Sequence, residues 1–538
     1  MAKPTRKSDE DIQSIVKDAI TSAKNFVQGE VEEERLRAMR LFKGEVPELG
    51  TPKDRSKVVA TKCRDAVRSV KPVLMRVFLQ SEKPAEYIPR GPDDVAGAEQ
   101  ATDYAQFKFD QSGGFQKIRD AFHDALVQKT GILKCYWDES ESVDIDEYSN
   151  LTEDQVAMYL QGEGVKVLEG TQKEMAMPDG TPIMLYDMKV SRTKTTGELR
   201  VDTVPPEHFF VDEGATSCDD FYVIGHSEEK RVSDLVEMGF DFDEVSMLGV
   251  EGEEEAQHER QTFASEDDEG TDPAMKKVTL TEAYMRVDIE GTGVARLYKF
   301  ICAGHQHKVL DHELADDVPF AIYEIDPEPH AFFGRSLIDL IEEDQNIATS
   351  LLRGLIDGVH IANNPKTAYR EGQVDVEALL NNEYGALIAA TDPQTDILEF
   401  SSPNSAATAL PAMQYYDGVV DMKTGVSQAG MGMDSDALQA QTVVGANAMV
   451  QAAQSQIEMM ARNLAEGGYA RSFKVLFKLI RKHVPPGEHM RLGGQFVPVD
   501  PTGWNAEMDV QTNVGLGTGQ KAERIAALQQ HQMWQQTV

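Results

Sequence analysis

Apolar residues recur at three- and four-residue steps along much of the chain, and the longest such stretch follows an apolar run at 318–325 and a turn holding Pro327 and Pro329. The stretch begins at Ser336, which suits a helix N-cap, with Asp339 at the position of a capping-box acid, and it stops before Pro365. Its apolar stripe comprises Leu337, Leu340, Ile341, Ile347, Leu351, Leu352, Leu355, Ile356 and Val359. A helix of this length spans about 40 Å. The pattern therefore predicts one long amphipathic strut.

Four further helical patterns precede this strut in the first 131 residues, at 8–42, 57–79, 94–111 and 115–130. Pro72 lies inside the second pattern, so we expect it to kink or split that helix. Gly131 is expected to cap the fourth helix, after which a strand begins. Residues 1–131 therefore predict a helical region.

Between residues 132 and 335 the pattern changes to short β-like runs, at 132–137, 165–169, 184–190, 198–204, 209–211, 222–229, 278–287 and 295–301. Turns are predicted at 178–180 and at Thr196-Gly197, and a helix at 232–238. Residues 251–270 hold nine acidic residues against one basic residue, Arg260, and show no apolar periodicity. We predict an antiparallel β-rich region with an acidic excursion.

After the strut, residues 363–405 predict a small α/β insertion with a strand at 367–370, a helix at 374–382 and a hairpin of 385–390 with 396–400. A helix returns at 406–426, so two antiparallel helices can carry the insertion at one end. Gly430 and Gly432 then break the helical pattern within 427–437. A long helix is predicted over 438–486, interrupted at Gly467-Gly468, and strand-and-turn material follows. The fold class is α+β, mainly helical.

Charge and composition exclude some classes of function. The formal net charge of the 538 residues is −38, although the first 78 carry a positive balance. This acidity argues against a protein that coats nucleic acid, because neutralising phosphates requires Lys and Arg. Four scattered cysteines without a CxxC pair suit a reducing compartment. No secretory signal or membrane-spanning run is expected.

Two motifs have residue types that occur in binding sites. The glycine-rich run 515–521 lacks the P-loop spacing, and no Ser or Thr follows Lys521, so it suits a flexible turn. Cys302, His305, His307 and His312 could form a zinc site, but their flanking residues favour an exposed hairpin. A metal-dependent nucleic-acid hydrolase therefore stays an alternative. No catalytic motif has a supporting context, so we expect no enzyme, no cofactor and no metal.

The chain resembles the portal proteins of tailed bacteriophages, the head-to-tail connectors, and most of all the large portals of short-tailed phages. The segments that carry the resemblance are 62–72, 74–78, 89–94, 98–104, 120–137, 332–336, 344–346 and 515–528. Their order over nearly the whole chain is more specific than any one of them. Another capsid-associated adaptor is the remaining alternative.

The resemblance implies a ring, usually dodecameric, around a central channel. It implies a wing made of 1–131 and 132–335, a first stem helix at 336–362, a clip at 363–405 and a second stem helix at 406–426. A tunnel loop at 427–437, a long kinked wing helix at 438–486 and a crown at 487–538 would follow. Large portals of this kind often continue into a C-terminal helical barrel, which we expect to be short or missing here.

The resemblance also implies sites and partners. The candidates are Gln428, Met431, Met433 and Asp434 for a loop touching DNA, Asp339, Glu342, Glu343 and Asp344 for an acidic channel lining, and Tyr369, Arg370, Glu371, Asp392 and Asp396 for docking at the clip. The implied partners are the terminase large subunit, the major capsid and scaffolding proteins, a tail adaptor and double-stranded DNA passing without sequence preference. Such a protein is built into one vertex of the virion after assembly in the host cytoplasm.

Overall fold

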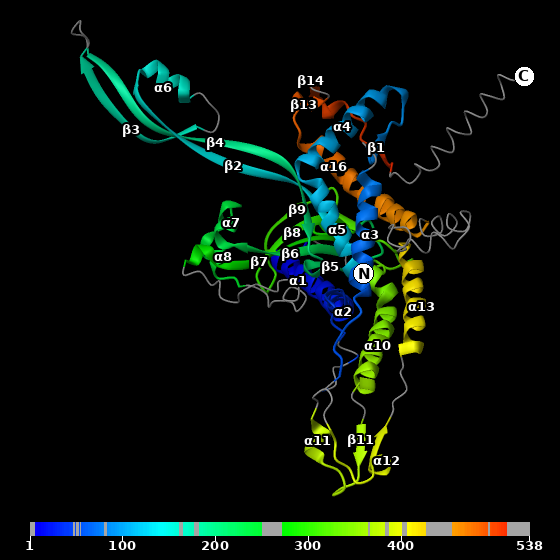
Figure 1. Cartoon of the computed structure of the whole chain (residues 1–538). Helices are drawn as coiled ribbons and strands as arrows, with labels where there is room; N and C mark the ends of the chain where they lie inside the picture. Colours follow the sequence, from blue (N-terminus) through cyan, green and yellow to red (C-terminus); the bar gives the residue numbers. More distant parts are fainter. Residues whose placement is uncertain are drawn as a thin grey trace, which may run out of the picture.

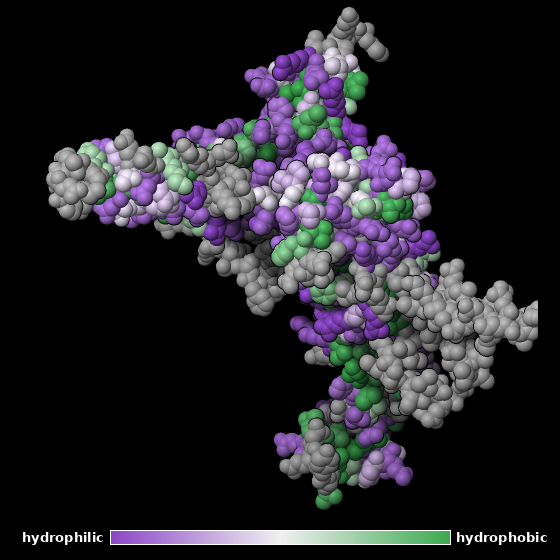
Figure 2. All heavy atoms as spheres, turned by 90° about the horizontal axis from the view of Figure 1, so that it is seen from above, coloured by the Kyte–Doolittle hydropathy of each residue, from purple (hydrophilic) through white to green (hydrophobic). Residues whose placement is uncertain are grey.

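The computed structural model describes residues 6–46, 49, 53, 55–79, 83–160, 165–176, 182–249, 272–363, 366–381, 387–400, 406–426, 455–492 and 495–513. A central body of helices and sheets carries two projections (Figure 1). A long β arm leaves one side, and a pair of helices runs down to a small tip. Figure 2 shows a mainly hydrophilic face with scattered hydrophobic patches.

The N-terminal pattern forms one helical rod that covers a sheet. Helix α1 (Asp9–Phe26) passes through a π turn, Val27–Val31, into α2 (Glu32–Lys43). Ser8 and Asp11 form a capping box at its start, and Gly44 ends it with a φ of 89°. The apolar stripe of α1 packs against strands β5, β6 and β9. The single helix predicted at 8–42 is confirmed, with a π turn inside it.

Three more helices confirm the helical region, with two corrections. They are α3 (Lys62–Leu79), α4 (Val95–Gln111) and α5 (Gly114–Gln128). Pro72 lies inside α3 without splitting it. Helix α5 ends at Lys129, with a φ of 72°, rather than at Gly131. Gly131 instead starts a strand against α5, where an added Cβ would lie 1.9 Å from the carbonyl oxygen of Ala121.

Two antiparallel sheets follow. One is ordered β5 (Phe209–Val211), β6 (Val223–Arg231), β7 (Lys277–Val287), β8 (Arg296–Ala303), β9 (Lys308–Leu314). The other is ordered β10 (Phe320–Tyr323), β2 (Gly131–Leu151), β4 (Pro182–Val204), β3 (Val165–Ala176). Short helices α7 (Val232–Glu237) and α8 (Phe242–Ser246) cover an end of the first sheet. The predicted antiparallel β-rich region is confirmed.

The β arm was not predicted, because its strands were expected to be short. Strands β2 and β4 run for 21 and 23 residues and pair along most of that length, with β3 and helix α6 (Glu153–Leu160) beside them. The turn predicted at Thr196-Gly197 is wrong. Gly197 pairs with Glu139 inside the ladder, and a Cβ there would lie 2.5 Å from the Trp137 ring. The glycine is needed for this close approach rather than for a turn.

The long strut and its partner form the lower projection. Helix α10 (Leu337–Asn363) packs along α13 (Ala406–Thr424). Between them lie β11 (Lys366–Tyr369), α11 (Val376–Leu380), α12 (Pro393–Asp396) and β12 (Ile397–Phe400). Strand β12 pairs with β11 instead of with 385–390, so the predicted hairpin is wrong. The two helices and the small α/β insertion are confirmed as elements.

The C-terminal part returns to the body. Residues 455–464 are helical and continue through a π turn, Ala465–Tyr469, into α16 (Ala470–His483). Strands β13 (Glu488–Leu492) and β14 (Gln495–Val499) form a hairpin. Strand β15 (Asp509–Thr512) pairs with β1 (Ala85–Ile88). The largest hydrophobic core gathers side chains from α2 to α5, β2, β4, α10 and α16, so distant segments share one interior.

Candidate functional site

The first candidate is the helix pair, α10 and α13. Ser336 starts α10 through reciprocal bonds with Asp339: the Asp339 N–H donates to Ser336 Oγ (3.0 Å), and the Ser336 N–H donates to Asp339 Oδ2 (2.8 Å). This is the capping box that the sequence predicted. It fixes the direction in which the long helix leaves the body.

Buried polar side chains tie the first half of α10 to the body. Gln345 is fully buried; its Oε1 accepts from the Cys63 N–H (2.8 Å), and its Nε2 donates to the Leu41 carbonyl (3.1 Å). Thr349 Oγ1 accepts from the Ala60 N–H (3.2 Å). Sequence reasoning missed both residues, because their partners lie nearly 300 positions away. Satisfied buried groups of this kind hold a helix in one register.

The second half of α10 stands clear of the body and is accompanied by residues 55–60. Asp357 accepts from the Ser56 N–H (2.8 Å) and lies 3.6 Å from Arg55. Arg353 donates through Nε to the Val58 carbonyl (3.0 Å). Val359 and Ile361 are 42% and 40% exposed. An apolar stripe therefore continues where the body no longer covers it.

The four acids expected to line a channel lie in different environments. Asp344 is buried and forms an ion pair with Lys423 of α13 (2.6 Å). Asp339 serves the cap and lies 3.4 Å from Lys129. Glu342 pairs with Arg37 (3.5 Å), whereas Glu343 is exposed. Glu343 is therefore the one of the four best placed to face a solvent-filled space.

The tip unit consists of residues 366–381 and 387–400. Asp396 is buried there: its Oδ1 lies 3.2 Å from Arg370 Nη1, and its Oδ2 accepts from the Asp392 N–H (2.7 Å). This carboxylate holds the tip together, and its expected docking role stays a prediction. Tyr369 and Glu371 are exposed.

Large apolar side chains on the tip unit are exposed. Val374 is its only buried apolar residue within the described part. The exposed ones are Tyr369, Val376, Leu380, Leu387, Ile388, Leu398 and Phe400, and Leu387 is 93% exposed. A two-stranded sheet without its own core is marginally stable in water. The tip unit therefore needs a covering surface.

The loop residues Gln428, Met431, Met433 and Asp434 lie outside the described residues, so their proposed contact with DNA stays a prediction. The histidine hairpin is described. Residues 304–307 join β8 to β9, as expected, but His307 is buried rather than exposed, and its carbonyl accepts from Gln13 Nε2 (2.8 Å). Cys302 packs in an apolar core. Across the described residues, no group of three His, Cys, Asp or Glu side chains could hold a metal.

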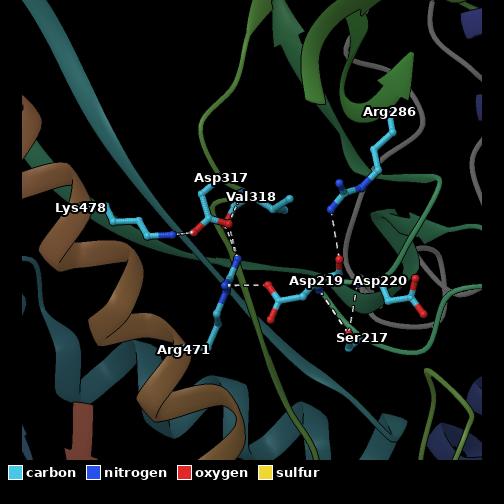
Figure 3. A network of polar contacts seen from close by, with 8 residues as sticks. All are labelled: Ser217, Asp219, Asp220, Arg286, Asp317, Val318, Arg471 and Lys478. Atoms are coloured by element: carbon cyan, nitrogen blue, oxygen red, sulfur yellow. Dashed lines mark hydrogen bonds and ion pairs between the residues drawn. The ribbon is translucent and has the colours of Figure 1, made fainter. Parts of the chain in front are cut away.

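A second polar cluster docks the last long helix onto the sheets (Figure 3). Arg471 of α16 contacts Asp317 (2.5 Å) and Asp219 (3.0 Å), and Lys478 also contacts Asp317. Burial alone would raise the pKa of Asp317, but the charge of Arg471 holds it below its usual value. Arg286 donates to the Asp219 carbonyl (3.1 Å). Basic residues of α16 are thus used for contacts within the chain.

The same helix also meets the turn that leads into α10. Asn463 Nδ2 donates to the Ile325 carbonyl (2.9 Å), and Tyr323 shares a hydrogen bond with Ser472 (2.9 Å). Glu324 Oε1 accepts from the Gly334 N–H (2.9 Å). Burial raises the pKa of Glu324 to about 7. The helix pair, the sheets and the C-terminal helix therefore meet at one junction.

A family model described as the phage SU10 portal protein matches residues 12–538. The chain belongs to this portal protein family. The match spans the body, the helix pair and the tip unit, and it confirms the resemblance derived from sequence segments. It makes the chain a phage portal protein, a structural component of the virion. No curated protein sequence matches the chain.

Within the ranges that the structure describes, no helix is both long and apolar enough to cross a bilayer.

Proposed function

We propose that copies of this chain assemble into a ring that surrounds the channel through which double-stranded DNA enters and leaves the capsid. The observation that carries the proposal is the tip unit, which exposes seven large apolar side chains and has almost no core of its own. A neighbouring copy at the same height in a ring would cover such a surface. Val359 and Ile361 on α10 and Leu410 on α13 extend the apolar surface toward the body.

In this ring the helix pair is the stem and the tip unit is the clip. The proposed division is a wing of 1–131 and 132–335, stem helices 336–362 and 406–426, a clip of 363–405, a tunnel loop of 427–437, a long helix of 438–486 and a crown of 487–538. The close packing of α10 along α13, with the tip unit between their ends, supports the stem and the clip. The pairing of β15 with β1 gives the crown and the wing a shared strand pair.

The acidity of the chain suits a channel that must not bind its cargo. Each subunit contributes a formal charge of −38 to a shared ring. Carboxylates facing the channel repel phosphates, so DNA slides instead of adhering. Glu343 is the best candidate for such a contact, because the other three acids on this part of α10 are engaged within their own subunit.

The clip also offers exposed polar groups for docking. Tyr369, Arg370 and Glu371 lie at the end of β11, and Asp392 lies nearby at the start of α12. We propose that this rim contacts the terminase large subunit during packaging and a tail adaptor afterwards. The wing lies at the other end of the helix pair from the clip (Figure 1). We propose that it faces the major capsid and scaffolding proteins.

Electron microscopy and mass photometry of the purified full chain test the ring. We expect closed rings with a central hole. Replacing Leu398 and Phe400 with Asp should shift the protein toward monomers. The matched control Met158→Asp changes an exposed residue on the arm and should leave the rings intact. Wild-type protein that stays monomeric at all concentrations and salt conditions would refute the proposal.

A further inference from the structure

Helices α7 and α8 form a small unit at the end of the five-stranded sheet, on the arm side of the body and away from the helix pair (Figure 1). The side of this unit that faces the sheet has its own apolar core. Val232, Leu235 and Val245 are buried against Val278 and Leu280 of β7. The stability of the unit therefore does not depend on further apolar residues.

The outer side nevertheless carries large apolar side chains. Val236 is 39% exposed, Met238 50%, Phe242 42% and Met247 84%. Single exposed apolar residues are ordinary, but four between positions 236 and 247 are a local concentration. Two of them are methionines, whose flexible side chains adapt to the shape of a bound partner.

The charge of this unit is mainly acidic, although Lys276 Nζ donates to the Ser246 carbonyl (2.8 Å) and Arg231 directly precedes α7. Residues 232–248 contain five acidic residues, Asp234, Glu237, Asp241, Asp243 and Glu244, and no Lys, Arg or His. Glu244 pairs with Lys308 (2.6 Å), and Asp241 caps α8. Glu237 and Asp243 are exposed. The neighbouring sequence 251–270 adds nine acidic residues against one Arg.

We propose that the α7–α8 surface is a docking site for a basic amphipathic helix of another protein. Apolar anchors beside carboxylates are complementary to a helix that carries an apolar stripe and flanking Lys or Arg. The inference goes beyond the channel role and does not depend on ring formation.

Binding of synthetic peptides to the full-length protein tests the site. The probe is a Leu/Lys amphipathic helix of roughly 18 residues, long enough to be helical when bound. Its affinity is measured by fluorescence anisotropy and compared with that of oligolysine of the same charge. We expect the amphipathic helix to bind at least about tenfold more tightly, because only it fills the apolar positions. Equal affinity would overturn the proposal.

Paired variants locate the binding. Combining Phe242→Ser with Met247→Ser should weaken binding about tenfold, whereas Met158→Ser, at a residue of α6 that is 76% exposed, should not. Asp243→Lys should weaken binding more than Glu99→Lys on α4. These residues are exposed, so the melting temperature should hold in every variant. Equal effects at the test and control positions would overturn the proposal.

Removing residues 251–270 tests whether this segment, and not another protein, occupies the α7–α8 surface. If the site serves another protein, replacing this segment with a short Gly/Ser linker leaves the peptide affinity unchanged or lowers it, because acidic charge is lost. A rise of about tenfold would mean that the chain's own segment covers the surface, and it would overturn the proposal.

Discussion

A buried carboxyl at the junction of α10 and the sheets makes stability depend on pH. The pKa of Glu324 is raised from 4.5 to about 7, so the folded protein holds this proton more tightly than the unfolded chain does. The stabilisation is therefore complete below pH 4.5 and is lost as the pH rises through 7.

Glu324→Gln keeps an acceptor for the Gly334 N–H but cannot ionise. We expect it to be more stable than the wild type by about 2 kcal/mol at pH 8 and to differ little at pH 5. Thermal unfolding at the two pH values measures this difference. The exposed control Glu328→Gln should change the unfolding temperature by the same amount at pH 5 and at pH 8. If Glu324→Gln gained the same stability at both pH values, the raised pKa of Glu324 would be contradicted.

The ion pair between Asp344 and Lys423 is unequally buried: the side chains are 7% and 39% exposed. Lys423→Met leaves the buried carboxylate without its cation, which should lower the unfolding free energy by about 2 kcal/mol. Lys482→Met removes an exposed pair with Asp316 and should cost less than about 0.5 kcal/mol. Denaturant titration of both variants measures the costs. Equal losses would show that Asp344 is effectively solvated.

This pair also shows what sequence reasoning could not supply. The capping box of Ser336 and Asp339 lies within four residues and was recognisable from sequence. The partner of Asp344 lies 79 residues away, on a helix whose orientation only the fold determines. Local periodicity placed all four acids on one helix but could not tell an exposed Glu343 from a buried Asp344.

At the scale of elements, the π turn Ala465–Tyr469 lets the C-terminal helix lie close to β10. An ideal Cβ on Gly468 would lie 2.5 Å from Tyr323 Cγ and 2.7 Å from the Ile322 carbonyl oxygen. Gly468→Ala should therefore cost about 2 kcal/mol or more in unfolding free energy.

Gly467 is the matched control, because its nearest neighbour would be 3.9 Å away. Gly467→Ala should be neutral or slightly stabilising, since alanine favours the helix. Chemical denaturation compares the two. Equal behaviour would show that the glycine pair acts through flexibility and not through close packing.

The prediction of elements succeeded where one side of an element is buried in the body. The range 336–362 differs from α10 by one residue at each end. The prediction of elements failed for the β arm, because solvent covers much of both faces of its strands. Ile145 and Val167 are 55% and 46% exposed there, and the paired residues Glu147 and Lys189 replace apolar alternation with charge pairing. Such strands leave little periodic signal for a sequence pattern to detect.

At the scale of the proposed ring, Glu343 and Glu342 should respond differently to charge reversal. Glu343→Lys should leave the melting temperature unchanged and reduce the yield of DNA-filled particles, because a cation attracts phosphate. Glu342→Lys places a cation beside Arg37 and should lower stability by about 1 kcal/mol. Thermal unfolding and counts of filled capsids separate the effects. Normal packaging by Glu343→Lys would remove this residue from the channel lining.

The pairing of β1 with β15 determines when this part of the fold can form during translation. Ala85–Ile88 must wait for Asp509–Thr512 before its strand pair closes. At a translation rate of ~5–20 residues per second, the intervening chain takes roughly 20–80 s to emerge. The nascent chain therefore cannot close this strand pair until Thr512 has been made. Truncated products that end before Asp509 lack the closing strand.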